Sequence, residues 1–228
     1  MKLKVMNGLK VLLAAPLILI LAMLFGQASL IYYPRDYSES DYQRILAQMD
    51  TLEYDVKGRP QTSFLMGSTD RPEKVWFLFG GNGSLALDWA DLIPVTESSD
   101  IAWILVDYPG YGLCEGSPNP ERIQRSIAAL VPIAADRLGL KEDELLQRSA
   151  VLGHSIGCAV ALKTAERHSV DEVVLISPFT SMLDMARRTI GPGICHLLTH
   201  RYDNRNALTA WADQAGAGNR PQLRIFHG

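Results

Sequence analysis

A serine between two glycines is the strongest chemical signal in this chain. The sequence Gly153-His154-Ser155-Ile156-Gly157 follows a short apolar run and precedes a helical pattern. At a sharp strand-to-helix turn the serine hydroxyl stands above the sheet, and the glycines let neighbouring backbone pass close. The pattern predicts that Ser155 is a nucleophile in acyl transfer, with a glycine-rich packing turn as the alternative. His154 is adjacent to Ser155 and is therefore expected to pack rather than to act as the general base.

A second glycine cluster, Gly80-Gly81-Asn82-Gly83, follows an earlier apolar run. Glycines at such a place let backbone amides approach a ligand. In combination with the serine turn, this cluster predicts an oxyanion hole formed by the backbone N–H groups of Asn82 and Ile156. Gly81 and Gly83 would line the same pocket.

The segment at residues 107–112, Asp-Tyr-Pro-Gly-Tyr-Gly, closes a further apolar run. Proline and glycine make it a stiff turn. We expect a structural role, with Tyr108 forming one wall of the pocket.

Short apolar runs and helical patterns alternate along the chain and must position these residues. Near-continuous apolar runs predict strands buried on both faces, and a strand–helix alternation predicts a doubly wound, mostly parallel α/β sheet. Sheets of this kind place their sites at the carboxyl ends of the strands, where the glycine clusters fall. The predicted strands are 75–79, 101–106, 150–152, 173–176 and 223–226, and the predicted helices are 121–137, 156–168 and the shorter 85–92 and 184–189.

Composition narrows the function class. The 228 residues are 47% hydrophobic and 21% charged, with a net charge of −3, which excludes a disordered chain and argues against a nucleic-acid partner. No repeat or low-complexity tract divides the chain after its first residues, which indicates one domain. The three cysteines form no C-x-x-C pair, and one disulfide with a free thiol or three reduced thiols both remain open.

The amino-terminal residues predict a membrane segment. Lys2, Lys4 and Lys10 precede residues 11–34, which contain no charged side chain. The length suits a single transmembrane span with the amino terminus in the cytoplasm and the domain on the extracytoplasmic side. We therefore divide the chain into a signal anchor, 1–34, and a domain, 35–228, with Tyr32 and Tyr33 at the far interface. A signal peptide cleaved near Ala28, which would leave a secreted domain, is the alternative.

The motifs as a set resemble the α/β-hydrolase superfamily, specifically its serine aminopeptidase-like branch with an amino-terminal membrane anchor. The resemblance runs through IYYPRDY, FLFGGNGS, VDYPGYGLCEGSPNP, VLGHSIGCAVAL, LISPFTSMLDMA, HRYDN and LRIFHG, which cover nearly all of residues 31–228 in order. It implies the hydrolase fold, Ser155 as nucleophile, Asn82 and Ile156 as oxyanion donors, and no cofactor. Gly80 stands where relatives commonly have histidine.

The same resemblance implies that the triad acid and base follow Gly228. We therefore expect a chain that is truncated relative to the family and lacks its last strand and helix. Asp184 is expected at a helix start, where its side chain would cap the helix. His196 and His200, spaced four residues apart, could bind a metal, but no third ligand is identifiable, so we predict no metal site.

Two functions follow from these observations. The first is a serine hydrolase that acts on an ester, thioester or amide bond of a small-molecule or peptide acyl substrate, impaired because its triad is incomplete. The second is a non-catalytic, membrane-tethered binding domain that keeps the pocket. Residues between Pro178 and Pro221 would form a small helical lid in either case.

Overall fold

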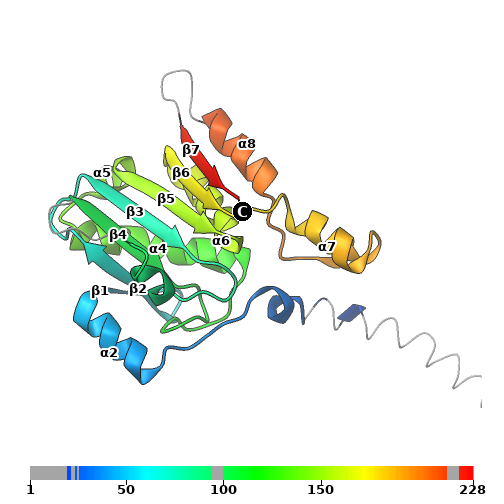
Figure 1. The fold of residues 1–228 in the computed structure, drawn as a ribbon, viewed down its shortest axis with the longest axis horizontal. Helices are drawn as coiled ribbons and strands as arrows, with labels where there is room; N and C mark the ends of the chain where they lie inside the picture. The colour runs from blue at the N-terminus through cyan, green and yellow to red at the C-terminus, as the bar shows by residue number, and fades with distance from the viewer. Residues whose placement is uncertain (1–19, 22–23, 25, 94–99, 215–220, 228) are drawn as a thin grey trace, which may run out of the picture.

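A computed structural model gives the fold and describes residues 20–21, 24, 26–93, 100–214 and 221–227. Its centre is a seven-stranded sheet in the order β1-β2-β4-β3-β5-β6-β7 (Figure 1). In the run β4-β3-β5-β6-β7 every neighbouring pair of strands is parallel. Strand β2 is antiparallel to both β1 and β4. The strands are β1 (Asp50–Asp55), β2 (Pro60–Gly67), β3 (Lys74–Phe79), β4 (Ile101–Val106), β5 (Ser149–His154), β6 (Glu172–Ile176) and β7 (Gln222–Phe226).

Helices cover both faces of the sheet, as the doubly wound pattern predicts. Helices α4 and α6 pack on one face, behind the sheet in Figure 1, and the short α3 packs on the other. The helices are α2 (Glu39–Gln48), α3 (Leu87–Ala90), α4 (Pro120–Arg137), α5 (Glu142–Gln147), α6 (Ile156–His168), α7 (Met182–Ile190), the 3-10 helix η1 (Ile194–Leu197) and α8 (Asn204–Gln214).

Helix α4 shows how the local sequence determines an element. The Asn119 side chain accepts a hydrogen bond from the Arg122 N–H at 2.8 Å, which satisfies one of the unpaired donors of the first turn. Pro120 follows at the first helical position, where its missing N–H costs nothing. The apolar residues at helical spacing, including Ile127 and Leu130, are fully buried against the sheet.

The predicted strands and helices are confirmed, with small shifts at their ends, and the two antiparallel strands were missed. In β1 only Leu52 and Tyr54 are buried, between charged and polar neighbours. In β2 the buried residues include Gln61, Thr62 and Ser63, and only the short run Phe64-Leu65-Met66 is apolar, so the pattern is weak. Their strand character comes from pairing with β4, which is a tertiary effect.

The amino-terminal prediction was wrong for one tyrosine. Most of the predicted span 11–34 lies outside the described residues, and among those described no helix is long and apolar enough to cross a bilayer. Tyr32, expected at a membrane interface, is only 2% exposed, and its hydroxyl lies 2.9 Å from that of Tyr202. Tyr33 is exposed. The core can take up the Tyr32 ring because the Tyr202 hydroxyl is there to pair with its polar end.

The site lies where the strand order reverses. Strand β3 stands between β4 and β5, so the connections leaving β3 and β5 turn to opposite sides of the sheet. Open α/β sheets usually bind their ligands in a crevice at the carboxyl ends of the strands at such a reversal. Residues 80–83 leave β3 there, and Ser155 follows β5 at the same edge.

Candidate active site

Ser155 occupies a strained turn between β5 and α6. Its backbone angles are φ 54° and ψ −115°, an unusual conformation for a residue with a side chain. Such strain costs about 1–3 kcal/mol and persists where surrounding contacts enforce it. Here the Ser155 N–H donates to the Ile176 carbonyl of β6 at 2.9 Å, and the Ser155 carbonyl accepts from the Cys158 N–H at 3.1 Å. The turn presents a half-buried hydroxyl at the first turn of α6.

Both glycines around Ser155 are required by close backbone approach. A Cβ on Gly153 would lie 2.3 Å from the Gly157 carbonyl oxygen. A Cβ on Gly157 would lie 2.1 Å from the carbonyl oxygen of Phe79 and 2.6 Å from that of Gly80. The start of α6 is therefore pressed directly against the beginning of the loop at residues 80–83.

That loop is held by all four of its carbonyl groups. The Gly80 carbonyl accepts from the Tyr108 hydroxyl at 2.8 Å, and the Gly81 carbonyl accepts from the Ser84 N–H at 3.3 Å. The Asn82 carbonyl accepts from the Tyr111 hydroxyl at 2.6 Å and from the Tyr33 N–H at 2.9 Å. The Gly83 carbonyl accepts from the Arg35 side chain at 3.1 Å.

The tyrosines that hold the loop act as neutral donors. Burial raises the pKa of both Tyr108 and Tyr111 well above the ordinary value of 10.0, so both phenols keep their protons at any physiological pH. The two rings also contact each other edge to face, with centroids 5.7 Å apart. Tyr108, predicted as a pocket wall, therefore positions the backbone of the predicted oxyanion loop.

Replacing Tyr111 with phenylalanine is expected to destabilise the protein by about 1–2 kcal/mol, because the Asn82 carbonyl and the Tyr33 N–H both lose a partner. Loosening this loop should also slow any covalent reaction at Ser155. Tyr54→Phe is the matched control, since the buried Tyr54 hydroxyl bonds Ser126 away from the loop. Urea unfolding and the rate at which a fluorophosphonate probe attaches to Ser155 are measured on the same variants. Equal slowing in the two variants would show that Tyr111 has no positioning role.

Asp107 is a buried carboxylate for which the sequence pattern predicted only a place in the turn at residues 107–112. It is 2% exposed, accepts from the Tyr37 hydroxyl at 2.6 Å and accepts from the Ala86 N–H at 2.8 Å. Burial raises its pKa to about 6. The carboxylate thereby joins the end of β4 to the approach to α3 and to the segment after the predicted anchor. An aspartate directly after an apolar strand was the available signal.

His154, His168, His196 and His200 are all engaged or placed away from Ser155. His154 packs on Trp89, with ring centroids 5.3 Å apart, and burial lowers its pKa. The His200 ring lies 5.5 Å from that of Tyr32. His168 is at the end of α6, and His196 is in η1. None of these four is seen to hydrogen-bond the Ser155 hydroxyl, and among the described residues no histidine joins a cluster of three metal ligands.

Asp184 and the cysteines take structural places. The Ser181 hydroxyl caps α7 by accepting from the Asp184 N–H at 3.0 Å. The predicted helix start is confirmed, but Asp184 lies in the first turn and Ser181, not Asp184, is the capping residue. Cys114, Cys158 and Cys195 are free and buried. Of the two alternatives that the sequence left open, the structure therefore shows three free thiols and no disulfide between them.

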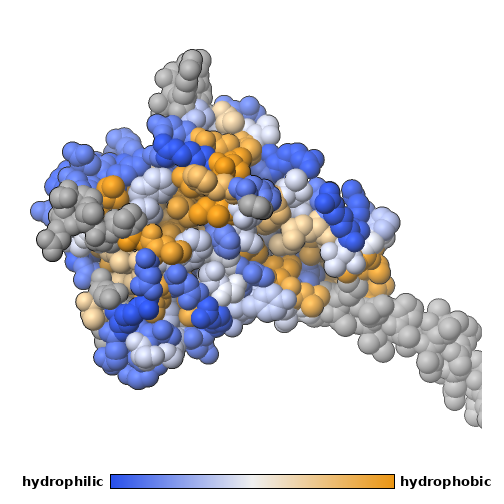
Figure 2. Space-filling model, viewed as in Figure 1, coloured by the Kyte–Doolittle hydropathy of each residue, from blue (hydrophilic) through white to orange (hydrophobic). Residues whose placement is uncertain are grey.

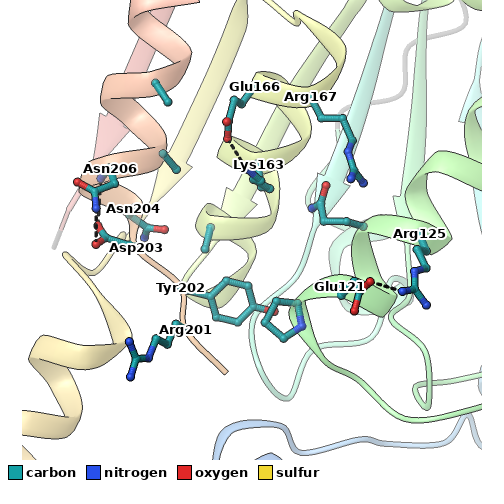
Figure 3. Close-up of a pocket in the computed structure, with 15 residues that line it drawn as sticks. Glu121, Arg125, Lys163, Glu166, Arg167, Arg201, Tyr202, Asp203, Asn204 and Asn206 are labelled. Atoms are coloured by element: carbon teal, nitrogen blue, oxygen red, sulfur yellow. Dashed lines mark hydrogen bonds and ion pairs between the residues drawn. The ribbon is translucent and has the colours of Figure 1, made fainter. Parts of the chain in front are cut away.

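A cavity of about 550 Å³ lies away from these residues, between α4, α6 and α8. Figure 3 shows charged side chains around it, and several are already paired: Arg125 with Glu121, and Lys163 with Glu166 at 2.7 Å. None of the residues predicted from the glycine motifs lines it. The residues predicted to do chemistry therefore lie at the turn of Ser155 and not in this cavity.

Known proteins match this chain over most of its length. The family model described as "Alpha/beta hydrolase family" matches residues 76–227. Uncharacterized protein YfhR of Salmonella typhi is 26% identical over 152 residues, covering 61% of this chain and 51% of that protein. Uncharacterized protein Rv2307c of Mycobacterium tuberculosis is 32% identical over 96 residues, covering 42% and 33%. The chain spans about half the length, or less, of these curated relatives.

Solved structures show the same fold. An alpha-beta hydrolase from Vibrio vulnificus superimposes with a TM-score of 0.63 at 15% identity, over 91% of this chain and 84% of that one. The Pyrococcus furiosus esterase PF2001 superimposes with a TM-score of 0.55 at 14% identity, over 87% and 89%. At these identities the likeness extends to the fold alone.

Proposed function

The chain belongs to the alpha/beta hydrolase family, and from that premise we propose that it is a hydrolase whose nucleophile is Ser155, acting on an ester, thioester or amide carbonyl. The observation that carries this proposal is the positive φ of Ser155 between β5 and α6, with the loop at residues 80–83 packed against the same turn. A strained serine at this place in an α/β sheet is the arrangement that exposes a nucleophilic hydroxyl.

The loop contacts support an oxyanion hole. The C=O and N–H groups of a trans peptide point in opposite directions. Since the Gly81 carbonyl is bound to Ser84, the Asn82 N–H points away from that turn, and the Ile156 N–H is an unpaired donor of the first turn of α6. In the proposed reaction Ser155 Oγ bonds to the acyl carbon, its proton passes to a histidine base, and these N–H groups stabilise the oxyanion.

The resulting acyl-enzyme is released by water in a second step. The base returns its proton to the leaving group, then takes one from the attacking water, and Ser155 regains its hydroxyl proton. The resemblance implies that this base and its carboxylate partner follow Gly228, and therefore come after β7 in the chain. The specific branch, a serine aminopeptidase-like hydrolase tethered by residues 1–34 on the extracytoplasmic side, is part of the same proposal.

A second function, a non-catalytic binding domain, is favoured by one observation. His154 packs on Trp89 and His200 lies beside Tyr32, so neither ring is paired with Ser155, and a serine without a base is a poor nucleophile. Such a domain would keep the crevice and its donors to bind an acyl compound without cleaving it.

A fluorophosphonate probe distinguishes the two functions. The hydrolase proposal expects covalent attachment to the 228-residue chain in detergent, detected by intact mass, and its complete loss in Ser155→Ala. Ser117→Ala, which removes an exposed serine hydroxyl in the loop before α4, is the matched control and should label normally. A p-nitrophenyl ester then reports turnover. Release of one equivalent of p-nitrophenol without further turnover would indicate that Ser155 is acylated but not regenerated, as expected for a nucleophile without its base. Absence of fluorophosphonate labelling would support the binding domain.

A further inference from the structure

An apolar groove of about 360 Å³ lies between α7, η1 and the helical residues 26–31. Its lining is apolar apart from Gln27 and Thr189. Several large side chains there face solvent: Leu30 is 68% exposed, Met185 47% and Ile194 40%. Figure 2 shows hydrophobic side chains gathered on the surface around α7. A grouped apolar surface of this kind indicates an interaction site.

Helix α7 is amphipathic, with cations beside its apolar stripe. Met182, Met185 and Ile190 recur at helical spacing and line the groove, and no residue of α7 is buried. Arg187 and Arg188 are exposed in its last turn. An apolar stripe flanked by arginines is typical of a helix that lies in a membrane interface.

The charge around the groove is positive. Asp184, the acidic residue of α7, lies 3.4 Å from Arg205 and 3.8 Å from Arg187, which offsets its charge. Arg188 has no acidic partner among the described residues. A further exposed cation, Arg201, donates to the Leu198 and His196 carbonyls at the end of η1. The groove therefore suits an anionic surface.

The groove is continuous with the predicted anchor. One of its walls, residues 26–31, is the end of the uncharged stretch 11–34. Gln27 Oε1 accepts from the Thr199 N–H at 2.6 Å and from the His200 N–H at 3.2 Å, which fixes this wall to the segment after η1. A bilayer that holds the part of this stretch before Gly26 would thus lie beside the groove.

We propose that α7, η1 and residues 26–31 dock on an anionic lipid bilayer, with the apolar groove at the acyl boundary and Arg187, Arg188 and Arg201 among the headgroups. This inference rests on the membrane tether of the proposed function. The docked surface would hold the domain in one orientation, so that the crevice at Ser155 stands at a constant height above the lipid.

Depth-dependent quenching tests the docking. The full chain is reconstituted in POPC vesicles with and without POPG, and an NBD fluorophore is attached at Met185→Cys; the native thiols are buried and should not react. Glu142→Cys on the exposed start of α5 is the matched control. We expect a spin-labelled lipid to quench the probe at 185 but not at 142, more strongly with POPG. Replacing Arg187 and Arg188 by glutamine should lower the docked-to-undocked ratio about 30-fold in POPG vesicles.

Alkaline carbonate extraction separates this inference from the tether. An unquenched probe at 185 on a chain that resists extraction overturns the docking and leaves the tether intact. A quenched probe on a chain that is extracted supports the docking and overturns the tether. Extraction together with an unquenched probe overturns both. Shielding of the probe from an aqueous quencher without lipid quenching assigns the groove to another occupant, such as a second copy, and also overturns the docking.

Discussion

Replacing Gly157 with alanine is expected to destabilise the protein by about 3 kcal/mol or more and to abolish probe attachment at Ser155. The added Cβ would lie 2.1 Å from the Phe79 carbonyl oxygen and 2.6 Å from that of Gly80. Both neighbours are backbone atoms of β3 and its loop, so neither can move aside as a flexible side chain would. Relief requires α6 to separate from the loop, which removes the geometry that the proposed oxyanion hole needs.

The matched control for this substitution is Gly193→Ala. Gly193 has an ordinary φ of −80°, and an added Cβ would meet nothing within 4 Å. Urea unfolding of the full chain in a mild detergent, followed by tryptophan fluorescence, compares the two variants with the unsubstituted chain. If Gly157→Ala unfolds at the same urea concentration as Gly193→Ala, the close approach of α6 to the loop is wrong.

Asp107 is expected to make the protein lose stability as the pH rises from about 4 to about 6. Burial raises the pKa of this carboxyl from 3.8 to about 6, so the folded state keeps a proton that the unfolded state has released. Since the folded state binds more protons in this window, rising pH favours unfolding, by on the order of 3 kcal/mol across the window. Above about pH 6 the contribution is constant.

Asp107→Asn should remove this dependence, so the difference in unfolding free energy between the two proteins should vary between pH 4 and 7. Tyr37→Phe gives a directional check. The Tyr37 hydroxyl donates to Asp107 at 2.6 Å and holds its pKa down, so losing it should move the window to higher pH. Urea unfolding at each pH measures both effects. A difference between Asp107→Asn and the unsubstituted chain that is constant with pH would contradict the buried, raised carboxyl.

Local sequence patterns were sufficient to predict the strands of the central sheet and the turn at Ser155. Strands β3 to β6 are recognisable because parallel strands buried on both faces are largely apolar. Strand β7 is exposed along its whole length, and its apolar residues alone marked it in the sequence. Gly153 and Gly157 are recognisable because the turn between a strand and a helix leaves no room for a Cβ. The antiparallel β1 and β2 were not predicted, since their polar residues become strand only by pairing with each other and with β4.

The supports of the site depend on contacts between residues far apart in the chain. Tyr111 is 29 residues from Asn82, Asp107 is 70 residues from Tyr37, and Tyr32 is 170 residues from Tyr202. No periodicity or spacing identifies such partners, because each tyrosine finds its acceptor only when the loops have folded together. The same holds for the groove, whose walls, residues 27–31 and 182–198, are far apart in the chain.

The sequence by itself determined the fold class, the position of Ser155 at a strand-to-helix turn, and the glycines that this turn requires, since these are consequences of local backbone sterics and hydrophobic patterning. Only the tertiary structure decided what holds the loop at residues 80–83, where Tyr32 packs, and that Asp107 is buried with Tyr37. Those features arise from long-range hydrogen bonds and desolvation, which depend on which segments the completed sheet brings together.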